Sequence, residues 1–219
     1  FRSTDIVMVA GPKEALPVFR QIHRNTRGLI SLNQDLGIGF SFVPDNYAAG
    51  CEVASYLYEK GHRKIGIALS RPEFPDEFGE RYRGARDYLD EKGIELMTEV
   101  VDETKEYYAM VEDFVCRYVE QGVTAILCVK DITAMMVYQI VRKLGLSVPS
   151  DISVVGFDDR CYSGNVVPAL SSVRYPVEAM GHAAMDCIER LLRGERPAIK
   201  KKIPMALLKR DSVCKKEDN

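Results

Sequence analysis

The chain has 219 residues, of which 46% are hydrophobic and 28% are charged, and its 30 basic and 32 acidic residues give a net charge of −2. This length suffices for one large α/β domain or two small ones, each with its own buried core. The balanced charge excludes the strongly basic surface of a nucleic-acid-binding module, so we expect any DNA-contacting segment to lie outside this chain.

The expected elements alternate between short apolar runs and stretches with helical periodicity. Apolar runs bounded by turn residues predict buried parallel strands, and apolar residues at three- and four-residue steps, as in Val111, Phe114, Val115 and Tyr118, predict helices. We expect strands at 5–10, 28–32, 64–69, 125–129 and 152–157. Helices are expected near 14–24, 47–60, 80–92, 108–121, 132–144 and 177–193. A final extended run follows from Ile203 to Leu208. This alternation indicates an α/β fold with parallel sheets flanked by helices on both faces.

The cysteines and the hydropathy pattern indicate the cellular compartment in which the protein is expected. Six cysteines are scattered without a CxxC pair, which favours free thiols and a reducing cytoplasm over a disulfide scaffold. No apolar stretch approaches the roughly 18 residues that a membrane-spanning helix needs, so we expect no membrane association. A signal peptide cannot be judged from a chain that begins at Phe1.

Polar side chains follow the predicted strands. Because ligands of open parallel sheets bind beyond the carboxyl ends of the strands, these residues are the candidates for a binding site. They are Asn33 and Gln34, then Ser70 with Glu77, Glu80 and Arg81, then Lys130 and Asp131, and finally Asp158 and Asp159. Carboxylates that accept from hydroxyl groups and a guanidinium that donates back suit a polyhydroxylated ligand.

Several of these residues have a simpler structural explanation. Asp131 directly precedes a predicted helix and is expected to be its N-cap. Asp159 fits a solvated turn equally well, and Arg81 could pair only with a neighbouring glutamate. Asp158, at the tip of the most apolar strand, is the strongest candidate for a ligand contact.

Motifs for catalysis and cofactor binding are missing. The sequence contains neither a GxGxxG turn after a strand nor a GxxxxGK[ST] loop, and it has no GxSxG elbow. Its three histidines (His23, His62 and His182) lack partners at metal-ligand spacing. We therefore expect no cofactor, no metal and no enzymatic activity.

An ordered series of short motifs runs through residues 46–212. It comprises Asp45-Asn46-Tyr47, GHRKI from Gly61, RYRG from Arg81, TAI from Thr124 with DITA from Asp131, GLSVPSDISVVGFDD from Gly145 to Asp159, PALSSV from Pro168, and LKRDS from Leu208. This series resembles the sensor domain of the lactose-repressor (LacI/GalR) family of bacterial transcription regulators. The run that ends in Asp158-Asp159 is the most specific part of the match.

The resemblance implies a periplasmic-binding-protein-like fold, in which three crossover strands join two lobes. On this basis residues 1–45 and 175–204 form the N-lobe, and residues 46–174 and 205–219 form the C-lobe. The family's effector contacts fall on Arg81 and Asp158, with Asn33, Glu77 and Lys130 nearby. Its dimer surface falls on one helix face and a following turn, and we assign to it Met135, Tyr138, Gln139, Cys161 and Tyr162.

Two features depart from the family pattern. Lys130 stands where the family has Asn or a small residue, which suggests an anionic effector such as a sugar phosphate or sugar acid, unless Lys130 only neutralises Asp158 or Glu77. The family's DNA-reading helix-turn-helix and the first part of the N-lobe are absent, so the N-lobe is expected to be incomplete.

The favoured function is therefore that of a cytoplasmic, homodimeric regulator, most simply a repressor. A sugar or related metabolite binds in the cleft between its lobes and allosterically controls operator DNA binding through a head outside this chain, of the helix-turn-helix or the winged-helix (GntR) type. An extracytoplasmic sugar receptor of an ABC transporter, built on the same fold, is the alternative. An enzyme of doubly wound fold is a distant third.

Overall fold

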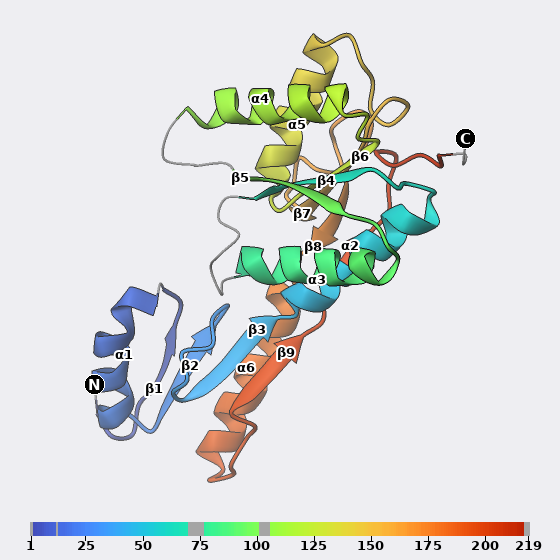
Figure 1. The fold of residues 1–219 in the computed structure, drawn as a ribbon. Coiled ribbons are helices and arrows are strands. Elements are labelled where there is room, and N and C mark those ends of the chain that lie inside the picture. Colours follow the sequence, from blue (N-terminus) through green and yellow to red (C-terminus); the bar gives the residue numbers. More distant parts are fainter. Residues whose placement is uncertain (1, 12, 70–76, 101–105, 217–219) are drawn as a thin grey trace. The chain divides into compact units, whose positions relative to one another are not determined.

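The computed structural model describes residues 2–11, 13–69, 77–100 and 106–216 (Figure 1). The chain divides into two compact units, Phe1–Asp45 with Pro176–Pro204, and Asn46–Tyr175 with Met205–Asn219. The polypeptide thus passes from one unit to the other three times. We call them unit 1 and unit 2 and describe each by itself.

Unit 1 is built on a four-stranded parallel sheet. Its strand order is β1 (Ile6–Val9), β2 (Gly28–Leu32), β3 (Phe40–Pro44) and β9 (Lys200–Ile203). A short 3-10 turn (Lys13–Ala15) leads into α1 (Leu16–Asn25), and α6 (Val177–Leu192) is the second helix of the unit.

The two helices of unit 1 cover opposite faces of its sheet. Leu29 of β2 packs with Phe19 of α1, whereas a Cβ on the preceding Gly28 would lie 3.0 Å from Leu191 of α6. Successive residues of a strand point to opposite faces, so these two contacts place α1 and α6 on different sides.

Unit 2 contains a six-stranded sheet in the order β10-β8-β7-β6-β4-β5. The strands are β4 (Ile65–Leu69), β5 (Leu96–Val100), β6 (Ala125–Cys128), β7 (Ser153–Asp158), β8 (Ser171–Arg174) and β10 (Ala206–Leu208). All neighbours pair in parallel except β10, which is antiparallel to β8. The central strands β4, β6 and β7 are almost wholly buried, as the unbroken apolar runs predicted.

Four helices cover the two faces of this sheet. In Figure 1, α4 (Tyr107–Glu120) and α5 (Asp131–Lys143) lie on one face, and α2 (Asn46–Glu59) and α3 (Glu77–Glu91) lie on the other. Two hydrophobic clusters correspond to these faces, one containing Leu57 and Leu89, the other Phe114 and Val137. The α/β architecture with parallel sheets flanked by helices is confirmed.

The run from Ile203 to Leu208 was predicted as one extended element, and this prediction is wrong. It divides at Pro204 into the end of β9 and the whole of β10, which belong to different sheets and different units. Proline has no N–H to donate to a strand ladder, so pairing stops there. Strands β3, β5 and β8 were not anticipated, and all three are paired.

No helix among the described residues combines the length and the apolar character needed to cross a bilayer. All six cysteines are free thiols, with Cys128 and Cys187 buried and Cys161 exposed.

Candidate functional site

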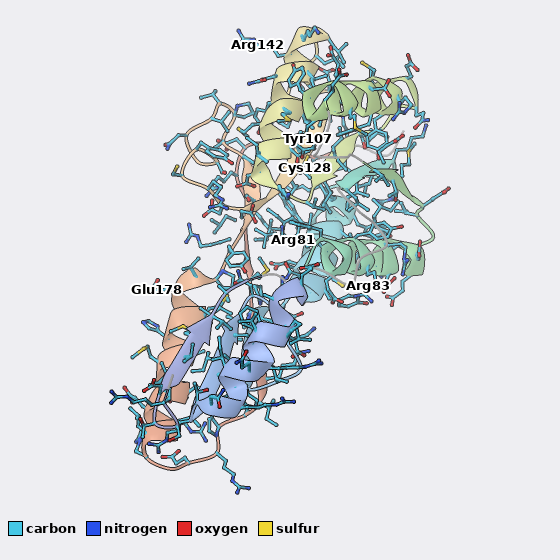
Figure 2. The ribbon with its side chains drawn as sticks, turned by 90° about the vertical axis from the view of Figure 1, so that its left-hand side faces the viewer. Arg81, Arg83, Tyr107, Cys128, Arg142 and Glu178 are labelled. Atoms are coloured by element: carbon cyan, nitrogen blue, oxygen red, sulfur yellow. The ribbon has the colours of Figure 1, made fainter. Side chains whose placement is uncertain are left out.

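Arg81 is the centre of the candidate site. It lies on α3 in the interior of unit 2, and only 1% of it is exposed (Figure 2). Its Nε donates to Oδ1 of Asn46 at 2.9 Å, and a terminal nitrogen donates to the carbonyl oxygen of Val129 at 2.5 Å. Both terminal nitrogens lie 3.5 Å from Oδ1 of Asp158. The guanidinium is therefore fixed by groups from α2, from the segment after β6 and from the end of β7.

Aromatic rings complete the surroundings of this guanidinium. Its central carbon lies 4.6 Å from the ring centre of Phe157 and 5.3 Å from that of Phe78, both within cation–π range. The Nζ of Lys130 lies 4.6 Å from the ring centre of Phe78. Two cations, two rings and one carboxylate thus gather where β6 and β7 end.

Two glycines explain how α3 brings Arg81 to this position. A Cβ on Gly50 of α2 would lie 2.1 Å from the carbonyl oxygen of Arg81, and a Cβ on Gly84 of α3 would lie 2.0 Å from that of Tyr47. Side chains at either position would push the two helices apart. Because Gly84 lies only three residues after Arg81, the close approach of α2 and α3 at Gly84 also positions the Arg81 guanidinium.

Asp158 ends β7 in an unusual backbone conformation. Its φ angle is +109° and that of Asp159 is +50°, values that L-residues rarely adopt. The turn directs the Asp158 carboxylate toward Arg81, and 21% of the side chain remains exposed. Burial raises the pKa of Asp158 from its ordinary value, although Arg81 opposes this shift. Strained backbone of this kind is often found where a ligand-binding group must be oriented.

Arg81 and Asp158 therefore contribute differently to the site. Arg81 has almost no accessible surface and holds the cluster together, whereas Asp158 presents its carboxylate to solvent. An accessible acceptor beside a fixed cation and aromatic rings can bind a small molecule that carries hydroxyl or amide donors.

Asp131 was predicted to be a helix N-cap, and this prediction is wrong. Lys130 occupies the N-cap position of α5, and Asp131 is the first helical residue. The fully buried Asp131 carboxylate accepts hydrogen bonds from the backbone N–H of Arg160 (2.9 Å) and from the hydroxyls of Ser163 (2.5 Å) and Ser172 (2.6 Å). Burial raises its pKa, and the two serine hydrogen bonds oppose this shift. Asp131 thus fixes the turn that follows Asp158.

Asp159 is not the solvated turn residue considered as one alternative. Its side chain is only 8% exposed and pairs with Nε of Arg174 at 2.8 Å and with a terminal nitrogen of Arg210 at 2.5 Å. Its backbone N–H donates to the hydroxyl of Ser172. Asp159 therefore has a structural role that ties the turn to β8 and to the C-terminal segment.

Two predicted effector contacts are not tested by the structure. Glu77 begins α3, but its side chain lies outside the described residues, as does the loop at 70–76. Asn33 belongs to unit 1, where it follows β2 with a φ angle of +73°. A ligand contact from either residue stays a prediction.

Three contributors to the cluster were not selected from the sequence. Asn46 occurred only within a family motif, Phe157 only as part of a strand and a motif, and Phe78 was not singled out at all. The pairing of Asn46 with Arg81 spans 35 residues, so no local pattern could have indicated it.

The residues assigned to a dimer surface lie on α5 and in the segment that follows β7. Gln139 and Cys161 are exposed, Tyr162 is 37% exposed, and Met135 and Tyr138 are half-buried. The hydroxyl of Tyr138 donates to the carbonyl oxygen of Pro168 within the same unit. A role of this face in dimerisation stays a prediction.

Among the described residues, no three His, Cys, Asp or Glu side chains are arranged to hold a metal ion. The buried Cys128 has a thiol whose pKa is raised by burial, so it is a poor nucleophile.

Comparison with known proteins gives a consistent result. A sequence profile described as a periplasmic binding protein-like domain matches residues 54–213. Over 145 residues the chain is 33% identical to the HTH-type transcriptional regulator MalR of Streptomyces coelicolor, covering 65% of this chain and 42% of that protein. It is 29% identical over 182 residues to the HTH-type transcriptional repressor PurR of Serratia proteamaculans, covering 80% and 52%. The chain thus spans about half the length of these relatives.

Solved structures show the same fold. A LacI-family transcriptional regulator from Burkholderia phymatum has 27% sequence identity and a TM-score of 0.75, covering 95% of this chain and 77% of that one. A LacI-family regulator from Enterococcus faecium, solved with bound ribose, has a TM-score of 0.80 at 19% identity and covers 97% and 81%.

Proposed function

The chain belongs to the family of periplasmic binding protein-like domains, in the form found in LacI-type regulators, and on that premise we propose that it senses a small-molecule effector for a bacterial transcription regulator. The effector is a sugar or a related polar metabolite. Its binding controls the affinity of a DNA-binding head for operator DNA. Repression is the expected mode of control.

The observation that carries this proposal is the arrangement of Arg81 and Asp158. These residues are separated by 77 positions in the sequence, yet the Arg81 side chain, from α3, lies 3.5 Å from that of Asp158 at the carboxyl end of β7. An Asp158 carboxylate that is oriented by strained backbone, and still accessible, is suited to accept hydrogen bonds from vicinal hydroxyls.

Sensing requires that the effector distinguish two conformations of the protein. A ligand shifts such an equilibrium only by its difference in affinity for the two states, and operator binding must change effector affinity by the same factor. We propose that units 1 and 2 are the N-lobe and C-lobe of the sensor and that the three chain crossings between them allow this change.

The proposal includes a homodimer, which would set the spacing of two operator half-sites. The face with Met135, Gln139, Cys161 and Tyr162 is the proposed interface. Ile132 of α5 (47%) and Val167 (91%), which are close to these residues in sequence, are exposed apolar side chains and support this assignment, because exposed large apolar side chains favour association.

Lys130 bears on whether the effector is neutral or anionic. Its ammonium group and the Arg81 guanidinium both lie within cation–π range of the Phe78 ring, so two cations contribute to the site. This composition supports a sugar phosphate or sugar acid as the second candidate, with a neutral sugar as the first.

A thermal-unfolding panel tests the proposal. Neutral sugars, sugar acids and sugar phosphates are added to the purified chain and to Asp158→Asn, because a ligand that binds only the folded state raises the midpoint of unfolding. We expect at least one compound to raise the midpoint of the wild-type chain and to leave that of Asp158→Asn unchanged. Equal shifts in both proteins would show that Asp158 is not a contact, and binding of neutral sugars alone would exclude the anionic effector.

A further inference from the structure

A second cavity lies in unit 2, away from the candidate effector site. Its volume is about 590 Å³, and it is lined by Arg63, Lys64, Lys92, Gly93, Ile94, Glu95, Met97 and Gln121. These residues lie where β4 and β5 begin and where α3 and α4 end. Arg81 and Asp158 lie instead near the other end of the sheet, so the two sites use different elements. The volume falls within the roughly 300–1,000 Å³ of small-molecule sites.

Three cations and one carboxylate, Glu95, line this cavity. Among the described residues, Arg63, Lys64 and Lys92 form no ion pair, whereas six other arginines of unit 2 each pair with a carboxylate. These are Arg81, Arg83, Arg86, Arg117, Arg174 and Arg210. The cavity therefore has an excess of positive charge that the described side chains do not neutralise.

Uncharged groups hold the cations in place. A terminal nitrogen of Arg63 donates to the carbonyl oxygens of Tyr58 (2.9 Å) and His62 (3.2 Å), and the guanidinium lies 4.2 Å from the Tyr58 ring centre. The Nζ of Lys92 lies 5.5 Å and 6.0 Å from the ring centres of Tyr88 and Tyr58. Arg63 and Lys92 are thus oriented without losing their charge, which lowers the entropic cost of binding an anion.

Lys64 has a partial structural explanation. Its Nζ donates to the carbonyl oxygen of Gln121, just past the end of α4, where a cation compensates the helix dipole. Arg63 has a similar contact, because the Tyr58 carbonyl lies in the last turn of α2, but both of its carbonyl contacts use the same terminal nitrogen. The Nζ of Lys92 lies against tyrosine rings instead. The argument therefore depends mainly on Lys92 and on the other nitrogens of Arg63.

The buried His62 lies near further cations. Burial is the main cause of its lowered pKa, but Lys216, Arg63 and Lys60 each lower it further through their charges. Two more cations therefore act in the same region as Arg63, and the positive potential extends beyond the cavity wall.

We propose that this cavity is a second ligand site, which binds a compact polyanion with two or more phosphate or carboxylate groups. Arg63 and Lys92 bind the charged groups, and Lys64 adds to the positive potential. The site is independent of effector binding at Asp158.

Inorganic pyrophosphate is the probe for the test. Calorimetric titration at low ionic strength compares the wild-type chain with Arg63→Gln, Lys92→Gln and the control Arg86→Gln. The control makes the same change of charge in unit 2, but Arg86 already pairs with Asp87 at 2.7 Å. We expect each cavity variant to bind pyrophosphate about tenfold more weakly and the control to stay within about twofold of wild type. Amide NMR shifts should change at residues 63–64 and 92–95.

Lys92→Gln keeps the test valid if Arg63→Gln fails to fold, because Lys92 contacts only tyrosine rings. Absence of wild-type binding at millimolar pyrophosphate would overturn the proposal. It would also be overturned by equal weakening in Arg86→Gln, or by binding of an acidic peptide but not of pyrophosphate. Asp158→Asn should bind pyrophosphate as the wild type does, so failure of this site is distinguishable from failure of the proposed effector site.

Discussion

Gly156 of β7 and Asp131 of α5 approach each other so closely that a Cβ on Gly156 would lie 2.2 Å from Oδ1 of Asp131. No real Cβ tolerates that distance, so glycine at position 156 is required for the buried carboxylate to reach its three donors. The motif that contains Gly156 and Asp158 therefore specifies a packing contact as well as the candidate ligand contact.

Gly156→Ala should destabilise unit 2. The added methyl group would meet the Asp131 carboxylate and a Leu170 methyl at 3.0 Å, and overpacking of this kind costs about 1–3 kcal/mol. Urea unfolding followed by circular dichroism measures the change. The matched control is Gly181→Ala on α6, where a Cβ meets nothing within 4 Å and alanine should stabilise the helix by about 0.5–1 kcal/mol. A neutral effect of Gly156→Ala would contradict the predicted clash.

Asp131→Asn tests whether the carboxylate itself is needed. The amide oxygen can still accept from both the Arg160 N–H and the Ser163 hydroxyl, which share one carboxylate oxygen, but the NH₂ group then faces the Ser172 hydroxyl, whose proton loses its acceptor. A buried donor without a partner costs about 1–3 kcal/mol, and we expect a loss of stability of this size in urea unfolding. Ser163→Ala removes one donor and leaves the other two bonds intact, so it should cost less. The reverse order would show that the charge at position 131 is not the main contribution.

Arg81→Lys should behave as a damaging substitution although it keeps the charge. Lysine cannot reproduce the planar arrangement that reaches Asn46, Val129 and Asp158 together, nor the guanidinium's contacts with two rings. Breaking a buried, hydrogen-bonded charge cluster costs about 3–5 kcal/mol, so we expect a clearly lower urea midpoint. Arg83→Lys, on the same helix but largely exposed, is the control and should stay within about 0.5 kcal/mol of wild type.

His62 should make the protein less stable at mildly acidic pH. Burial lowers the pKa of this fully enclosed imidazole from 6.5 to about 4, and its Nε2 bonds to the Cys214 carbonyl while Nδ1 faces the Thr124 hydroxyl. The unfolded chain then binds more protons than the folded one between these values, so stability falls as the pH drops from 6.5 toward 4. A difference of about 2.5 pKa units corresponds to a total loss of ~3 kcal/mol.

The measurement for His62 is urea unfolding at a series of pH values in wild type and in His62→Gln. Asp131 and Asp158 have raised pKa values, and their contributions have the opposite sign because the folded state then binds more protons. The difference between the two proteins isolates the histidine. A difference that does not change between pH 7 and pH 4 would show that His62 does not titrate as predicted.

Much of the fold could be predicted because its signals are local. The apolar runs at β4, β6 and β7 are long enough and uniform enough to specify buried parallel strands, and helices α2 to α6 carry their periodicity in contiguous residues. Arg81 and Asp158 were selected because they follow such strands. Chain order alone placed these candidate residues at the same end of the sheet.

Other features depend on partners distant in sequence, and only the tertiary structure decided them. Ser171 and Ser172 were noted only within a family motif, yet they are buried residues of strand β8, because β7, β10 and the Asp131 carboxylate satisfy their polar groups. The same holds for Asp131. The local pattern predicts a helix cap, but in the fold its carboxylate accepts hydrogen bonds from donors about 30 to 40 residues away. The sequence by itself determined where apolar surface must be buried. Which polar groups could be buried with it depended on where the folded chain supplied hydrogen-bond partners.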